Sequence, residues 1–275
     1  MVASGQARMI DDIGFYWLAF PLVGAVAGVL AGLFGIGGGI VVVPVLYLFF
    51  RHMGIDEAYR IHLAIGTSLA IIVFTSVSSL VAHHRRGAVL WHAVRVLAGG
   101  IVIGGLLGAA LAHAMSFATL RTAFGLLVIV IALYIVLGYR PPPRRTLPGL
   151  AGGTLAGTAM GAIASLAGIG GGVMTNPFLL WCGAPMRNAV ATAAACTFPV
   201  AVAGTLGFVV VGWPVTAGVP GATGYVFWPA VAGIAVGSTL TAPLGARIAH
   251  AVPVQGLRRA FAVVLVLVGL RMLLA

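Results

Sequence analysis

The sequence predicts an all-α polytopic membrane protein built from two homologous repeats, and three observations carry this prediction. The first is composition: of 275 residues, 61% are hydrophobic and only 7% are charged, whereas a soluble domain carries about a quarter charged residues. The second is a series of charge-free stretches long enough to cross a bilayer. The third is a pair of glycine motifs, one in each half of the chain. A water-soluble globular protein, and with it most cytosolic enzymes, is therefore excluded.

The charged residues agree with a membrane protein. All 15 basic residues are Arg, and the net charge is +11. They lie between apolar blocks, so positive cytoplasmic loops explain them better than a nucleic-acid partner does. The absence of Lys excludes a Walker P-loop and a Schiff-base enzyme. Cys182 and Cys196 form no CxxC or zinc pattern, so we expect no metal and no cofactor. We expect the protein to lie in the lipid bilayer and to bind no nucleic acid.

The charge-free stretches mark the expected spans in order. The first apolar run follows Asp11 and Asp12 closely and shows no cleavage site, so we expect an uncleaved first span. A final span is expected from about Arg258 to Leu274. The stretch 188–246 is long enough for two spans, separated by the turn residues of 212–224. The charge-free stretches are 13–50, 61–84, 96–120, 122–139, 146–186 and 188–246.

A Pro/Arg-rich linker divides the chain into two related halves. Consecutive prolines in 139–149 cannot continue a helix, so we expect a first transmembrane repeat of residues 1–138 and a second of residues 150–275. The motif Gly-Ile-Gly-Gly-Gly occurs at 35–39 and again at 168–172, each time followed by a proline. Rare residue types also recur at one spacing of 137 residues: Trp91 and Trp228, His113 and His250, Arg121 and Arg258. Repeats of this kind are the usual architecture of secondary transporters.

The distribution of Arg favours inverted repeats. If each half opens with a helical hairpin broken at its glycine cluster, ten Arg lie on one side of the membrane. Five Arg and all four acidic residues then lie on the other side. This arrangement obeys the positive-inside rule better than single crossings do, and it makes the two halves inverted relative to each other.

The glycine clusters are the candidate substrate site. Each Gly held in a helix costs about 1 kcal/mol, so we expect the helix to unwind there, with both clusters facing each other near the midplane. Asn176-Pro177 predicts an N-cap followed by proline at the first helical position. Free N–H groups at a restarting helix bind anions, assisted by the helix dipole. Close helix packing is the alternative for glycines in a membrane, and we assign it to ladders such as Gly24 and Gly28.

Polar residues in the spans complete the candidate site. Thr67, Ser68 and Thr192 occur in equivalent places and could complete an anion's hydrogen bonds, or could bond to neighbouring helices. Arg121 and Arg258 could attract anions at a cavity mouth, or snorkel to the interface. No carboxylate lies inside a span, which argues against the usual cation relay. The candidate substrate-binding residues are Gly35, Ile36, Gly37, Gly38, Gly39, Gly168, Ile169, Gly170, Gly171, Gly172, Thr67, Ser68, Asn176 and Thr192.

The paired motifs resemble those of the TauE/SafE family of sulfite exporters and sulfonate permeases. The residues that carry the resemblance are Gly35–Gly39 with Pro44, Ala64–Ser68, and Gly168–Gly172 with Pro177, in a match that covers nearly the whole chain. The resemblance implies a carrier in the cytoplasmic membrane of a bacterium or archaeon, for sulfite, sulfonates, sulfoacetate or similar anions. The chain departs from strict symmetry, because the Gly66-Thr67-Ser68 run weakens to Ala191-Thr192-Ala193.

We therefore expect a secondary transporter of small sulfur-containing anions, and not an enzyme. The alternatives are a non-transporting assembly or scaffold protein and an intramembrane enzyme, although no span contains a convincing catalytic set. A redox carrier that uses the two cysteines is a further alternative. The sequence leaves open which anion is carried, in which direction and with which coupled ion. It also leaves the oligomeric state open, a homo-oligomer included.

Overall fold

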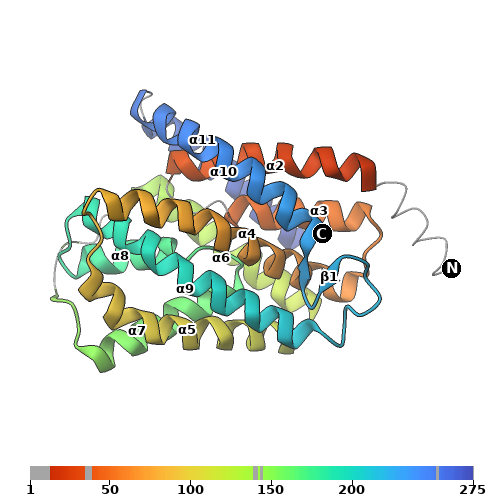
Figure 1. The fold of residues 1–275 in the computed structure, drawn as a ribbon, viewed down its shortest axis with the longest axis horizontal. Helices are drawn as coiled ribbons and strands as arrows, with labels where there is room; N and C mark the ends of the chain where they lie inside the picture. Colours follow the sequence, from red (N-terminus) through yellow and green to blue (C-terminus); the bar gives the residue numbers. More distant parts are fainter. Residues whose placement is uncertain (1–12, 35–38, 139–141, 143–144, 252–253, 275) are drawn as a thin grey trace.

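The computed structural model describes residues 13–34, 39–138, 142, 145–251 and 254–274, and it confirms a predominantly helical membrane protein (Figure 1). The described residues form a helical bundle with one short two-stranded hairpin. In chain order the elements are α2 (Ile13–Phe34), α3 (Gly39–His52), α4 (Glu57–Arg85), α5 (Trp91–Ala114), α6 (Phe117–Leu137), α7 (Leu150–Leu166), α8 (Gly172–Trp181), α9 (Met186–Gly212), β1 (Ala222–Thr223), β2 (Val226–Phe227), α10 (Trp228–Ala251) and α11 (Val254–Leu274).

Four of these helices are long and apolar enough to cross a membrane: α4, α5, α6 and α9. Large apolar side chains point outward on the bundle; Leu137 and Leu155, for example, are each 75% exposed. An outer surface of this kind suits lipid and would not be stable in water. The chain is therefore a multi-pass membrane protein. As the sequence predicts, 188–246 contains two separate helices, because α9 ends at Gly212 and α10 begins at Trp228.

Two helices are too short to cross the bilayer. α3 has 14 residues and α8 has 10, which corresponds to about 21 Å and about 15 Å of helix. The hydrocarbon core is about 30 Å thick, so each of these helices reaches only part of the way. Each follows a longer helix in the chain, α3 after α2 and α8 after α7 (Figure 1).

The helix pairs follow one pattern in both halves. The first helix of each half packs against the fourth helix of the other half: α2 lies against α10, and α7 lies against α5. α4 packs on α9 and α6 packs on α11, which pairs helices of the same rank in the two halves. Two helices of the first half, α3 and α4, also pack together, as α8 and α9 do in the second half.

Glycines allow the closest of these contacts. A Cβ added at Gly24 or Gly28 of α2 would overlap the backbone of Ile234 or Ser238 of α10. At the equivalent Gly157 and Gly161 of α7, an added Cβ would lie 2.5 Å from the backbone oxygen of Leu97 or Ile101 of α5. These four glycines therefore serve close helix packing, as expected for small residues at intramembrane contacts.

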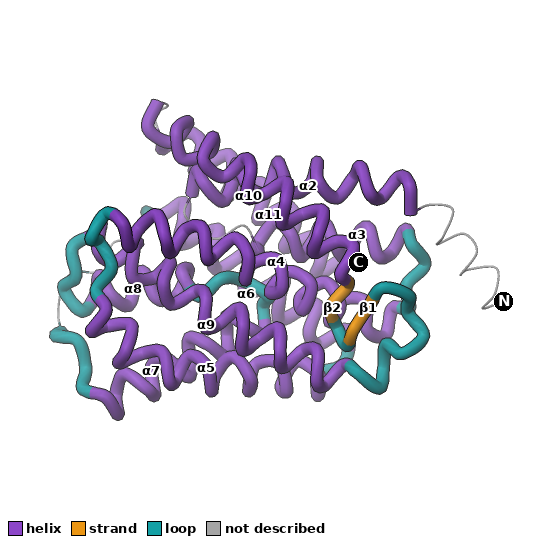
Figure 2. The backbone as a smooth tube through the Cα atoms, viewed as in Figure 1, coloured by secondary structure: helices purple, strands orange, loops and turns teal. Residues whose placement is uncertain are grey.

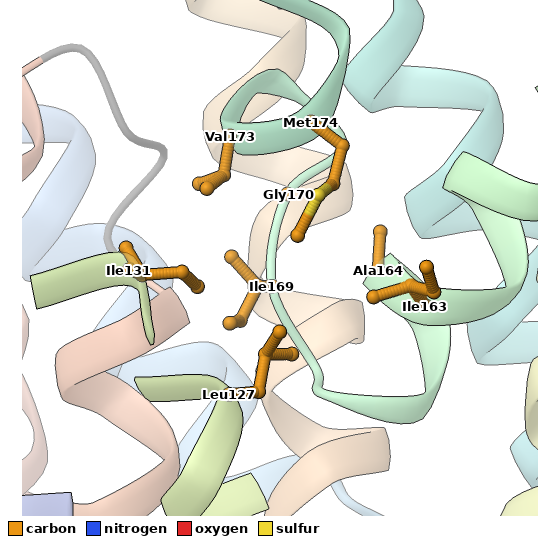
Figure 3. A pocket seen from close by; sticks show the side chains of 8 residues that line it. All are labelled: Leu127, Ile131, Ile163, Ala164, Ile169, Gly170, Val173 and Met174. Atoms are coloured by element: carbon orange, nitrogen blue, oxygen red, sulfur yellow. The ribbon is translucent and has the colours of Figure 1, made fainter. Parts of the chain in front are cut away.

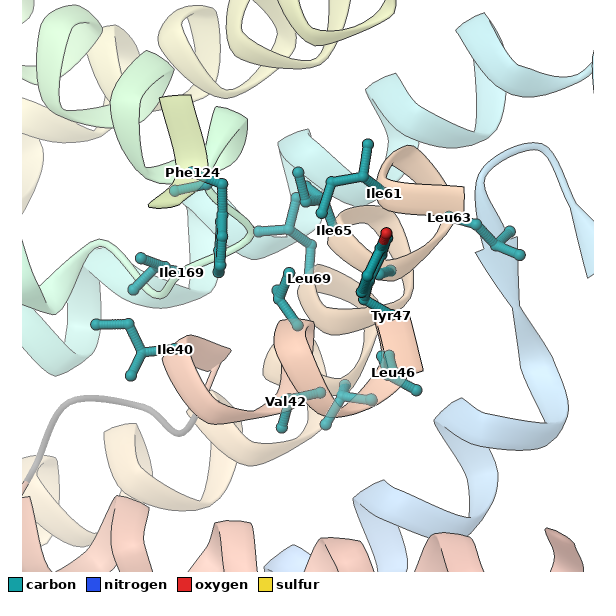
Figure 4. Packing of buried hydrophobic residues seen from close by; sticks show 14 of the residues in the cluster. Ile40, Val42, Leu46, Tyr47, Ile61, Leu63, Ile65, Leu69, Phe124 and Ile169 are labelled. Carbon is teal, nitrogen blue, oxygen red and sulfur yellow. The ribbon is translucent and has the colours of Figure 1, made fainter. Parts of the chain in front are cut away.

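A buried apolar cluster joins helices of the first half to the connection between α7 and α8 (Figure 4). Ile40 of α3, Leu69 of α4 and Phe124 of α6 gather there with Ile169 from the connection between α7 and α8. None of these four side chains is more than 2% exposed. The connection between α7 and α8 is thus held inside the protein and not at its surface.

The hairpin between α9 and α10 is a feature that the sequence did not predict beyond a turn. β1 and β2 pair antiparallel, with Ala222 opposite Phe227, and lie at one end of the bundle (Figure 2). Tyr225, in the turn, is only 3% exposed, and its N–H donates to the carbonyl of Phe208 at 3.1 Å. The hairpin is therefore tucked between helices and does not extend into solvent.

Candidate functional site

The helix breaks within the second glycine cluster, as the sequence predicts. α7 ends at Leu166 and α8 begins at Gly172, and the connection between them is not helical. Gly168 has φ of +64°, a left-handed conformation that costs other residues about 1–2 kcal/mol. Figure 3 shows Ile169 and Gly170 in this connection, with Val173 and Met174 in the first turn of α8.

The two glycine clusters meet at this break. A Cβ added at Gly39, the first residue of α3, would lie 2.6 Å from the carbonyl oxygen of Gly168. The hydroxyl of Ser68 on α4 donates to the same oxygen at 2.9 Å. Ser68 is fully buried, so this bond satisfies a carbonyl that the interrupted helix leaves free. The other residues of the first cluster, Gly35, Ile36, Gly37 and Gly38, lie outside the described part of the chain.

The start of α8 presents backbone donors. Among the described residues, neither the N–H of Gly170 nor that of Gly171 has an acceptor. The next N–H, that of Gly172, donates to Thr197 Oγ1 at 3.1 Å. The Thr197 hydroxyl in turn donates to the carbonyl of Ala193 at 3.0 Å. Two N–H groups without an acceptor in the described part of the chain thus precede the positive end of a helix dipole.

Two side chains in the second turn of α8 add unsatisfied polar atoms. Thr175 is fully buried, and its Oγ1 has no partner among the described residues. The same holds for Oδ1 of the neighbouring Asn176. A buried polar atom without a partner costs about 1–3 kcal/mol, so the site is unsatisfied as it stands. Rotating the Asn176 side-chain amide by about 180° would place its Nδ2 donor where Oδ1 now lies.

The prediction that α8 starts at Asn176-Pro177 is wrong. α8 starts at Gly172, and Asn176 is its fifth residue, not an N-cap. Pro177 lies inside the helix and not at its first position. The physical reason is the contact with Thr197, which accepts from the N–H of Gly172 and allows the helix to begin without a polar cap of its own.

Thr67 and Thr192 bind the starts of helices in the opposite half. Thr67 Oγ1 on α4 accepts from the N–H of Phe227, directly before α10, at 3.0 Å. Thr192 Oγ1 on α9 accepts from the N–H of Leu90, directly before α5, at 3.0 Å. The two bonds occupy equivalent places in the two halves. Each hydroxyl keeps a hydrogen that it can donate to a further group.

Arg121 lies apart from the break. Its guanidinium stacks on the ring of Phe117, 5.2 Å from the ring centroid, and its Nε is buried without a partner among the described residues. Leu127 and Ile131 of the same helix line the pocket at the break. Arg121 precedes Leu127 by six residues, which corresponds to about 9 Å along the helix axis. The side chain of Arg258 is outside the described part.

An apolar pocket borders the break between α6 and α8 (Figure 3). Its cavity volume is only about 10 Å³, which is room for about one water-sized group. No side chain that lines the pocket is polar, although the backbone of Gly170 borders it. The pocket therefore has no room for an organic group, while the N–H groups of the connection suit negative charge. The lining residues are Leu127, Ile131, Ile163, Ala164, Ile169, Gly170, Val173 and Met174.

Sequence reasoning missed Thr175 and Thr197, which the structure places at the start of α8. Their signal is weak, because neither has a polar equivalent in the first half: Thr175 corresponds to Val42 and Thr197 to Ile72. The cysteines are unpaired thiols, and burial raises the pKa of Cys182, which makes its thiolate scarce. In the described part, no three His, Cys, Asp or Glu residues are grouped to hold a metal.

Comparison with known proteins places the chain among membrane transporters. The family described as "Sulfite exporter TauE/SafE" matches residues 20–272. A probable membrane transporter protein of Haemophilus influenzae is 36% identical over 92% of this chain and 96% of its own length. A probable membrane transporter protein of Methanocaldococcus jannaschii is 28% identical over 94% and 97% of the two chains. Comparison with solved structures gives no significant match.

Proposed function

Because the chain belongs to the sulfite exporter TauE/SafE family, we propose that it is a secondary transporter for a small sulfur-containing anion bound at the start of α8. The observation that carries this proposal is the set of unsatisfied groups there. The N–H groups of Gly170 and Gly171 have no acceptor among the described residues, and a Cβ added at Gly171 would lie 3.8 Å from the buried hydroxyl of Thr175, which has no partner among them either. An oxyanion of sulfur accepts several hydrogen bonds and would satisfy all three donors.

The small size of the pocket favours sulfite over a bulky organic sulfonate. The space beside Gly170 holds about one water-sized group, so we propose that the anion uses the helix start alone. Thr67, Ser68 and Thr192 are proposed to support the site by holding the neighbouring segments, as their hydrogen bonds indicate.

The paired contacts support inverted repeats and transport by alternating access. α2 packs on α10 as α7 packs on α5, and the bond from Phe227 to Thr67 has its equivalent in the bond from Leu90 to Thr192. In transporters of this architecture, one repeat rocks against the other around a site at their interface. We propose that the meeting point of Gly39 and Gly168 is that interface.

Removing one hydroxyl tests the site. Thr175→Val keeps the shape of the side chain but removes a donor to the anion, and a hydrogen bond to a charged group contributes about 1.5–3 kcal/mol. We expect sulfite affinity to fall by a factor of about ten or more. The measurement is uptake of radiolabelled sulfite into proteoliposomes as a function of concentration, together with the rise in melting temperature that sulfite produces.

Thr205→Val is the matched control. Thr205 on α9 also has a buried hydroxyl without a partner among the described residues, but it is not part of the α8 start. We expect this variant to bind sulfite like the unmodified protein. Unchanged affinity in Thr175→Val, or equal losses in both variants, would contradict the proposed site.

A further inference from the structure

A group of three aromatic, titratable side chains lies at the end of the bundle that carries the hairpin. His62 is on the second turn of α4, His113 is in the last turn of α5, and Tyr225 is in the hairpin turn. The transport site described above uses none of them. His62 and Tyr225 are each only 3% exposed, whereas His113 is exposed.

The contacts of His62 fix which of its nitrogens carries the proton. Nε2 lies 2.9 Å from the carbonyl oxygen of Ala112. A carbonyl only accepts, so Nε2 is the donor and the neutral ring leaves Nδ1 as a bare lone pair. This Nδ1 is buried and has no partner among the described residues. A buried imidazole with one nitrogen fixed as a donor and the other vacant is able to take up one proton.

Tyr225 stabilises the protonated form and connects it to the surface. Its ring stacks on His62 with the centroids 5.1 Å apart and the planes 28° apart. A cationic ring over an aromatic face is favoured electrostatically. The Tyr225 hydroxyl lies 3.1 Å from Nδ1 of the exposed His113. Tyr225 therefore touches both histidines, His62 through its ring face and His113 through its hydroxyl.

Few other charged groups face His62. Arg60, on the same helix, turns away from it and donates to the carbonyl of Ile55, from Nε at 3.0 Å and from its terminal nitrogen at 2.7 Å. Asp56 and Glu57 are exposed at the start of α4, where the Asp56 carboxylate caps the helix. Among the described residues, His113 and Tyr225 are the titratable groups placed against His62 from other elements.

The same helix connects His62 to the proposed anion site. Thr67 and Ser68 follow His62 on α4, about 8–9 Å further along its axis. Thr67 holds the backbone directly after the Tyr225 turn, and Ser68 holds the carbonyl of Gly168 at the helix break. A charge that forms at His62 thus acts on the hairpin and on the helix that supports the break.

We propose that His62 is the proton-binding site of a proton-coupled transporter, with Tyr225 as the stacking partner and His113 as the exposed entry group. This inference rests on the proposed anion transport and names its coupled ion. One proton from water binds Nδ1 of His62, which turns the neutral imidazole into an imidazolium. The same proton is released to water on the opposite side when the carrier changes conformation. The charge of one proton compensates that of a monovalent anion moved in the same direction.

Gradient-driven transport tests this proposal. With one proton coupled to each anion, a pH difference of one unit across proteoliposomes supports an accumulation ratio of about tenfold. We expect the unmodified protein to accumulate radiolabelled sulfite by this ratio. His62→Gln keeps an N–H for the Ala112 carbonyl but does not titrate. It is expected to lose the accumulation and to retain exchange of labelled for unlabelled sulfite at equal pH.

His92→Gln is the control, because His92 is an exposed histidine in the first turn of α5. It is expected to accumulate sulfite like the unmodified protein. Tyr225→Phe keeps the stacked ring and loses the hydroxyl, so we expect slower accumulation to the same final ratio. The proposal is overturned if His62→Gln still accumulates sulfite, or if the unmodified protein exchanges sulfite but does not respond to the gradient.

A substrate-free measurement separates this proposal from the anion site. Isotope-labelled histidine is followed by NMR in lipid nanodiscs, with the His62 signal assigned by its loss in His62→Gln. We expect this signal to titrate within the pH range in which the protein stays folded, and its midpoint to fall in Tyr225→Leu, which removes the stacked ring. A His62 ring that stays neutral over this range refutes proton binding, whatever anion the protein carries. Absence of any sulfite binding, with normal titration of His62, would instead refute the proposed substrate.

Discussion

At the scale of single residues, Gly168 determines where the chain leaves the α7 helix. Its backbone is left-handed, and its carbonyl is held by Ser68 of a different helix. An added Cβ would also lie 3.1 Å from the backbone of Ile65. The residue therefore combines a conformation that favours glycine with a close approach of two backbones. Both properties direct the chain into the connection that exposes the N–H groups of Gly170 and Gly171.

Gly168→Ala is expected to destabilise the protein. The left-handed conformation costs alanine about 1–2 kcal/mol, and the contact with Ile65 adds to this cost. Gly172→Ala is the comparison, because its Cβ would meet Thr197 Oγ1 at an ordinary 3.5 Å and would sit inside a helix. Thermal unfolding in detergent should show a clear fall in melting temperature for Gly168→Ala alone. Similar melting temperatures for the two variants would show that the backbone of Gly168 is not under this constraint.

At the scale of elements, two hydrogen bonds hold the starts of α5 and α10. Both bonds join a hydroxyl on one half to a backbone N–H on the other half. Neither α5 nor α10 starts with a side-chain cap among the described interactions. The start of each helix is therefore positioned by a threonine from a neighbouring helix, which couples the two halves at two equivalent points.

Thr67→Val and Thr192→Val should each lower the stability of the protein. Each substitution leaves a backbone N–H without its acceptor, which costs about 1–3 kcal/mol when the group is buried. We expect the larger loss for Thr67→Val, because Phe227 is more deeply buried than Leu90. Thr154→Val serves as the control, since its hydroxyl bonds only to Leu150 of its own helix. If the melting temperature fell equally in all three variants, the two hydrogen bonds between the halves would not contribute more to stability than the local bond of Thr154.

The elements also show what the sequence could predict. Hydropathy, prolines and turn residues located the long helices and the break between α9 and α10 correctly, because these depend on local composition. The start of α8 could not be located in this way. The local signal of Asn176-Pro177 favoured a later start, whereas a tertiary hydrogen bond from Gly172 to Thr197 decides it. Thr175 and His62 escaped notice for the same reason, since their significance depends on which partners the fold brings to them.

At the scale of the whole molecule, the first helix of each half packs on the fourth helix of the other half: α2 packs on α10, and α7 packs on α5. Gly24 and Gly28 of α2 were predicted to serve packing from the sequence alone. Their partners were not predictable, because any helix with a smooth face could have received them. In the structure, these tight pairs lie on opposite sides of α4 and α9 (Figure 1). The central helices thus carry the polar contacts, and the outer pairs supply rigid packing around them.

The central claim is that the start of α8 binds the transported anion. The most direct measurement is a structure of the protein with selenite, a heavier analogue of sulfite whose selenium is located by anomalous scattering. We expect one selenium position within hydrogen-bonding reach of the N–H groups of Gly170 and Gly171 and the hydroxyl of Thr175, and its loss in Thr175→Val. A selenium bound only elsewhere in the molecule, with the start of α8 closed by protein atoms, would contradict the account.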